Sequence, residues 1–142
     1  MNNQPSSGSG FLRVIVQTAG GALPVEGAAV DIYGSDRGNG NTGLLYSLQT
    51  GIDGLTPPVA LPAPPRAESL TPGTPTPFAR YNVEVHKEGY NRVTNLGVPV
   101  FDGIVSSQPV LLLPTVQGDE TGESIVESPE TGNALYGGVR NE

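Results

Sequence analysis

The sequence predicts an all-β fold, a Greek-key sandwich of seven short strands. Three observations lead to this prediction. The 142 residues include 20 glycines and 14 prolines, which favour turns over long helices. Several segments alternate apolar and polar side chains with the period of two that is typical of strands. No apolar pattern with the 3.6-residue period of a helix continues for three turns, so we expect essentially no helix.

The first three predicted strands lie in the N-terminal part of the chain. Residues 10–17 are largely apolar on both faces, which is typical of a strand inside a sandwich. A loop containing glycine and proline separates them from the second strand, residues 28–34. Residues 35–41 are rich in glycine and asparagine, which tolerate positive φ angles, and therefore predict a turn. The third strand follows over residues 43–50.

A proline-rich segment follows the third strand. It begins as a short edge strand within residues 55–65, because proline has no N–H to donate to a central ladder. Residues 62–77 are expected to be extended and polyproline-like. An extended segment of this kind is a preformed ligand for an aromatic groove, or it only stiffens a crossover between the sheets. The candidate binding residues are Pro62, Pro64, Pro65 and Arg66.

The last three predicted strands include the most regular one. Residues 79–90 alternate Tyr81 and two valines with polar side chains, so one face is expected in the core and the other in water. Residues 91–103 and 104–114 complete the set of seven.

Both ends of the chain differ in composition from the predicted sandwich, which spans residues 10–114. Residues 1–9 are small and polar and predict a flexible arm. Residues 115–142 are rich in carboxylates and glycine and predict an acidic, disordered tail. Within that tail, the apolar pairs Ile125-Val126 and Leu135-Tyr136 are alternatives to disorder, since each pair is able to dock onto a partner or an open sheet edge.

Charge and hydropathy exclude two classes of partner. Fourteen acidic groups against seven basic ones give a formal net charge of -7, so we expect no nucleic-acid partner. No apolar run approaches the roughly 20 residues of a membrane span. The first ten residues show neither the basic region nor the apolar region of a secretory signal, so we expect synthesis in the cytoplasm without a signal peptide.

The residue types offer few catalytic or metal-binding groups. The chain has no cysteine and a single histidine, His86, so a zinc site or a histidine-dependent triad has no second member. Residues 35–41 contain side-chain oxygens of the kind that bind calcium, but they lack the ligand spacing of an EF-hand loop. A turn with positive φ angles accounts for their glycines. Asp53 and Asp102 are expected to be turn carboxylates that bond to their own backbone. We therefore predict no enzyme, no metal and no cofactor.

Four stretches carry a resemblance to a known family: "ALPVEGAAVDIY", "GLTPPVALPAPPRAESL", "YNVEVHKEGY" and "VFDGIVSSQPV". They resemble the prealbumin-like, carboxypeptidase regulatory-like domains, and most of all the N-terminal non-catalytic domain of clostridial spore cortex-lytic enzymes. The resemblance covers residues 10–114. It implies the sandwich fold and an association with spore-forming Gram-positive bacteria, and it does not imply the activity of the separate peptidoglycan-cleaving domain of those enzymes.

The predicted function is that of a non-catalytic structural, assembly or binding module associated with the spore or cell envelope. Its partners would be proteins, including further copies of this chain. Self-association would use strand addition, because a strand directly follows the flexible arm. The candidate residues for strand addition are Phe11, Leu12, Val14 and Val16. The alternative is a regulatory or peptidoglycan-binding partner of a separately encoded cell-wall hydrolase.

Overall fold

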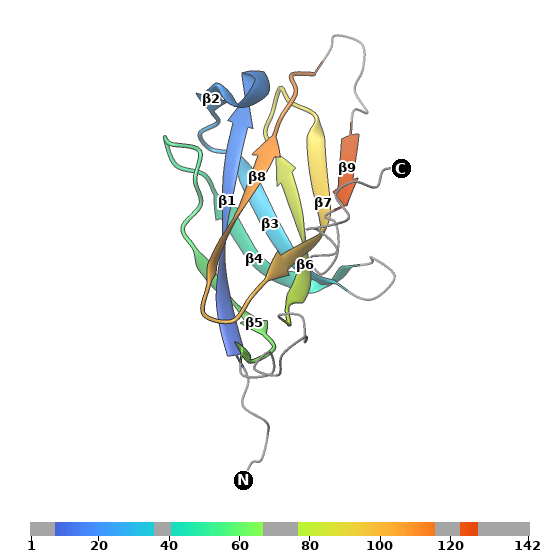
Figure 1. Cartoon of the computed structure of the whole chain (residues 1–142). Coiled ribbons are helices and arrows are strands. Elements are labelled where there is room, and N and C mark those ends of the chain that lie inside the picture. The colour runs from blue at the N-terminus through green and yellow to red at the C-terminus, as the bar shows by residue number, and fades with distance from the viewer. Residues whose placement is uncertain (1–7, 36–40, 67–76, 116–122, 128–142) are drawn as a thin grey trace, which may run out of the picture.

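Two β-sheets pack face to face in the computed structural model, which describes residues 8–35, 41–66, 77–115 and 123–127 (Figure 1). The first sheet is centred on β1 (Gly8–Thr18). β5 (Val59–Ala63) and β2 (Leu23–Pro24) pair antiparallel with one edge of β1. β8 (Val105–Leu111) pairs parallel with its other edge. Both edges of β1 are therefore paired with other strands of the same chain.

The second sheet contains five strands. Their order is β4 (Asn41–Gln49), β3 (Ala29–Ser35), β6 (Ala79–His86), β7 (Arg92–Val100) and β9 (Glu123–Glu127). Neighbours are antiparallel except β9, which runs parallel to β7. The prediction of an all-β sandwich is confirmed, and the described residues contain nine strands and one short 3₁₀ turn, η1 (Ala19–Gly21). No described helix is long or apolar enough to cross a membrane.

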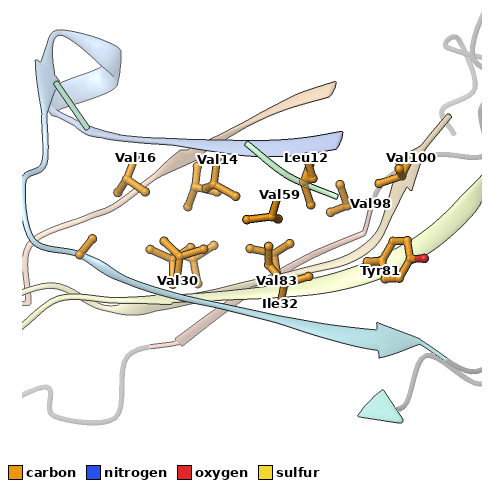
Figure 2. Packing of buried hydrophobic residues seen from close by; sticks show 14 of the residues in the cluster. Leu12, Val14, Val16, Val30, Ile32, Val59, Tyr81, Val83, Val98 and Val100 are labelled. Carbon is orange, nitrogen blue, oxygen red and sulfur yellow. The ribbon is translucent and has the colours of Figure 1, made fainter. Parts of the chain in front are cut away.

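The core lies between the sheets and consists mainly of valine side chains on alternating positions. From the first sheet, Leu12, Val14 and Val16 point inward and are fully buried. Ile32 and Val83 of the second sheet face them and are also fully buried (Figure 2). Burial of each such side chain contributes about 1.5–3 kcal/mol. The alternation visible in the sequence therefore corresponds to the two faces of each strand.

Two strands lie outside the predicted set of seven. β2 is a two-residue pairing at the end of β1. β9 falls inside the range predicted as a disordered tail, and its pairing with the edge of β7 agrees with the alternative, that Ile125-Val126 docks onto an open sheet edge. The side chains of Ile125 and Val126 remain 65% and 47% exposed, so apolar burial does not hold β9 in place. The backbone pairing with β7 does, and this pairing satisfies part of an open sheet edge.

A bulge between β6 and β7 sets the course of the last residues of β7. Asn82 is buried, and its Oδ1 accepts a hydrogen bond from the Gly97 N–H at 3.0 Å. The register shifts between Tyr81 and Val83, and Gly97 has φ +72°, a conformation that favours glycine. β9 pairs with β7 only as far as Leu96, directly before this bulge.

Candidate functional site

An apolar groove of about 540 Å³ lies at the corner where the chain passes from β7 in the second sheet to β8 in the first. Leu12 and Val98 belong to its lining and to the core. Phe101 and Ile104 come from the turn between the two strands, and Ser106 comes from β8. The size and the apolar lining with few polar groups are typical of a binding site.

The inward face of β8 changes along the strand. At its end, Val110 and the following Leu112 are 2% and 0% exposed and belong to the core. At its start, the equivalent inward positions are Ser106 and Gln108, which are only partly buried and line the groove. The packing between the sheets is thus incomplete at this corner, and polar side chains meet an apolar floor there.

Asp102 fixes the corner that forms the groove. Its Oδ2 accepts a hydrogen bond from the Arg66 N–H at 2.8 Å, and its Oδ1 accepts one from the Ser9 N–H at 3.0 Å. These two backbone donors, with a further contribution from the Arg66 charge, lower the pKa of Asp102. The expectation of a carboxylate bonded to its own turn is wrong for Asp102, because its partners lie 36 and 93 residues away in the sequence.

Backbone contacts complete the attachment of this corner to β1. Gly103 N–H donates to the Ser9 carbonyl, and Phe11 N–H donates to the Ile104 carbonyl, both at 2.9 Å. A Cβ on Gly10 would lie 2.1 Å from the Phe101 carbonyl oxygen, so glycine is required for this close approach. Phe101 is also held on its ring side, with its centroid 5.6 Å from that of Phe78.

Two strand edges beside the groove have no strand partner among the described residues. One is the edge of β8 that faces away from β1. The other is the edge of β7 from Gly97 to Val100, beyond the end of β9. Backbone N–H and C=O groups along such edges are able to pair with an added strand.

The segment predicted as a donor strand is placed differently from the expectation. Phe11, Leu12, Val14 and Val16 all belong to β1. Three of these four are fully buried, and Phe11 is 39% exposed. β1 pairs with β5 and β2 on one side and with β8 on the other, so it has no free edge to offer to a neighbour. The apolar character of both faces reflects a central strand, not a donor strand.

The predicted proline motif is fixed to the sandwich. Pro62 lies in β5, and its carbonyl accepts a hydrogen bond from the hydroxyl of Tyr81, whose pKa is raised by burial. The Ala60 carbonyl of the same strand accepts one from the Tyr46 hydroxyl at 2.9 Å. Pro64 and Pro65 are partly buried, and Arg66 is held by Asp102. These contacts support the crossover alternative for the part described; residues 67–76 of the segment lie outside the described ranges.

The remaining candidate groups do not come together. His86 is exposed at the end of β6. Asp53 accepts a hydrogen bond from the Leu55 N–H at 3.0 Å, as expected for a turn carboxylate. Of the oxygen-bearing side chains in the predicted turn at residues 35–41, Asp36 and Asn39 lie outside the described residues, whereas Asn41 begins β4 and its Oδ1 accepts a hydrogen bond from Asn82 Nδ2 at 2.8 Å. Among the residues that are described, no three acidic or histidine side chains form a group that could hold a metal ion.

Sequence comparison identifies no relative: no protein-family model matches the chain, and no curated protein is significantly similar to it. Solved structures do match. The catechol 1,2-dioxygenase of Acinetobacter sp. ADP1 gives a TM-score of 0.53 at 13% identity, over 89% of this chain and 60% of the enzyme chain. The Bacillus anthracis TIE protein gives 0.49 at 14% identity, over 76% of this chain and 17% of that one. GBS52, the minor pilin of Streptococcus agalactiae, gives 0.47 at 11% identity, over 78% and 47%.

The matches to catechol 1,2-dioxygenases at TM-scores of 0.52 to 0.53 show the fold alone, and the chain spans at most 60% of the length of the three proteins named. They correct one prediction. The prediction that the chain is not an enzyme is wrong, because the sandwich is similar to part of the fold of catechol 1,2-dioxygenases. Counting cysteines and histidines was too narrow a criterion to exclude catalysis on such a scaffold.

The fold that the family resemblance implies is confirmed, whereas the family itself is not shown. The chain is an all-β sandwich of two sheets, as expected. Its resemblance to the prealbumin-like, carboxypeptidase regulatory-like domains stays a prediction. The narrower resemblance to the domain of spore cortex-lytic enzymes has no support from the sequence comparisons and stays a prediction.

Proposed function

We propose that this sandwich is a protein-binding module that takes up an extended segment of a partner at the groove between β7 and β8. The observation that carries the proposal is the position of the groove beside two unpaired strand edges. An added strand would gain backbone hydrogen bonds from an edge and would place alternate side chains on the apolar floor. When the partner is another copy of the chain, the same site supports assembly, with the groove as acceptor in place of β1 as donor.

A peptide display experiment tests this function. Wild-type protein is used to select from a random library of 12-residue peptides, and a Ser106→Arg variant, whose long charged side chain fills the groove, is the comparison. Ser47→Arg is the matched control, because Ser47 is exposed on β4 and does not line the groove. We expect the wild type and the control to enrich peptides with alternating apolar residues, and the groove variant to lose them. Equal selection by all three proteins would reject the groove as a binding site.

Association with the spore or cell envelope, and with peptidoglycan as an alternative ligand, rests on the family resemblance. Retention of the protein on purified cortex or wall peptidoglycan tests that alternative directly. Loss of retention in the Ser106→Arg variant would place the ligand in the groove, and free passage of the wild type would reject peptidoglycan as a ligand.

A further inference from the structure

The direction of β9 brings its last residue, Glu127, close to the groove. β9 is parallel to β7, and its last residue, Glu127, pairs with Leu96. Val98, the first groove residue on β7, is two residues further in the same direction. Two strand residues span about 7 Å. The chain therefore leaves β9 beside the groove and pointing toward it, as the neighbouring positions of β9 and β7 in Figure 1 illustrate.

The sequence beyond β9 contains a segment suited to the groove. Residues 128–132 are polar or small, and residues 133–139 read "NALYGGV", which brings Leu135 and Tyr136 together with Ala134 and Val139. The other stretches outside the described ranges, residues 1–7, 36–40, 67–76 and 116–122, contain no comparable apolar cluster. The glycines next to the apolar residues permit close approach of backbone to backbone.

We propose that residues 133–139 occupy the groove between β7 and β8 of their own chain, as an internal ligand that a partner segment has to displace. The inference rests on the proposed function, because it names the first occupant of the same site. Attachment at Glu127 favours the same chain over a second copy, since a short linker gives an effective concentration in the millimolar range. A linker of five residues reaches roughly 12 Å, which is sufficient for a site that begins about 7 Å away.

An external peptide and residues 133–139, the tail, then compete for the same groove. Leu135 and Tyr136 supply the apolar contacts of the tail, so a Leu135→Asp, Tyr136→Asp variant is expected to leave the groove open. Peptides selected by the wild type should bind this variant more tightly, by at least tenfold if the tail is present at an effective concentration of about 1 mM and binds with a dissociation constant near 0.1 mM.

Disulfide trapping in the full chain tests the location of the tail. The natural sequence has no cysteine, so two introduced residues form a defined pair. One variant carries Ser106→Cys with Asn133→Cys, and its matched control carries Ser47→Cys with Asn133→Cys. Ser106 lines the groove on the inward side of β8, whereas Ser47 is exposed on β4, outside the lining, and donates a hydrogen bond to Asp31.

We expect the Ser106 pair to form an intramolecular disulfide several times faster than the Ser47 pair under mild oxidation. Equal rates would overturn the proposal, because the tail would then have no preference for the groove. Disulfides that link two molecules would overturn it as well, and would assign the groove to the tail of a second copy. Either result leaves the peptide-display test of the groove unaffected, so failure of this inference is distinct from failure of the proposed function.

Discussion

Single side chains hold distant parts of the chain together through hydrogen bonds to the backbone. Asp102 connects the start of β1, the end of the described proline segment and the β7–β8 turn through two backbone N–H groups. Thr50 links two other segments: its hydroxyl donates to the Val25 carbonyl at 2.6 Å and accepts from the Ala28 N–H at 2.9 Å. Both contacts replace strand pairing where the backbone has to turn.

Asp102 should make the free energy of unfolding depend on pH in the acid range. Its pKa is lowered in the folded chain relative to 3.8, so its contribution is present above pH 3.8 and is lost as the pH falls through the lowered value. An Asp102→Asn variant should therefore be less stable than the wild type at neutral pH, and the difference should shrink below pH 3.8. Urea unfolding at a series of pH values measures this difference. Asp53→Asn is the control, because a single amide oxygen is sufficient for its one local bond; an equal pH dependence in both variants would contradict the role of Asp102.

Replacing Thr50 with an apolar residue of the same shape should lower the free energy of unfolding. Thr50→Val leaves the buried Ala28 N–H and Val25 carbonyl without this partner, which costs about 1–3 kcal/mol of unfolding free energy. Thr42→Val in the exposed part of β4 should change it by about 0.5 kcal/mol or less. Chemical denaturation measures both values, and a neutral Thr50→Val variant would show that water replaces the hydroxyl.

At the scale of elements, the strands divide into those held by side-chain burial and those held by backbone pairing. β1, β3 and β6 place fully buried residues in the core. β9 has two largely exposed apolar side chains and one paired neighbour, so its stability depends mainly on hydrogen bonds to β7. Elements of the second kind open at low free energy and are suited to exchange with a partner.

Proline should therefore release β9 without unfolding the sandwich. Successive N–H groups of a strand point to opposite edges, so replacing both Ile125 and Val126 with proline removes at least one bond to β7. Faster amide exchange in Arg92–Leu96 is the expected result, with a thermal midpoint close to that of the wild type. Serine at both positions is the control, since it retains both N–H groups. Unchanged exchange in the proline variant would show that β9 does not protect β7.

At the scale of the whole molecule, stability resides in one core shared by the two sheets, whereas the candidate site lies at a corner where that core is incomplete. The groove uses Leu12 and Val98 of the core as its floor and the start of β8 as its wall. This arrangement separates the folding of the sandwich from ligand binding, because polar residues at the start of β8 contribute little to the core.

Two isoleucines that differ in burial should show which part of the molecule contributes most to the free energy of unfolding. Ile32 is fully buried and Ile52 is 78% exposed, so the same substitution to alanine tests core and surface. Ile32→Ala should lower the unfolding free energy by about 2–5 kcal/mol through lost burial and a cavity. Ile52→Ala should lower it by about 0.5 kcal/mol or less. Similar losses in both variants would contradict the position of the core.

The sequence by itself determined the sandwich and its seven main strands. Period-two alternation, as in residues 79–90, is a local property that each strand carries independently of its neighbours. Burial of Tyr81 followed from the same pattern.

Only the tertiary structure decided the central place of β1, the pairing of β9 with β7, the long-range contacts of Asp102 and the position of the groove. Each of these depends on contacts between segments that lie far apart in the chain, up to 93 residues for Asp102 and Ser9. Apolar composition on both faces of residues 10–17 is compatible with a donor strand and with a central strand, and sheet order alone distinguishes the two. Local patterns determine which residues form strands, whereas the folded chain determines which strand edges remain open.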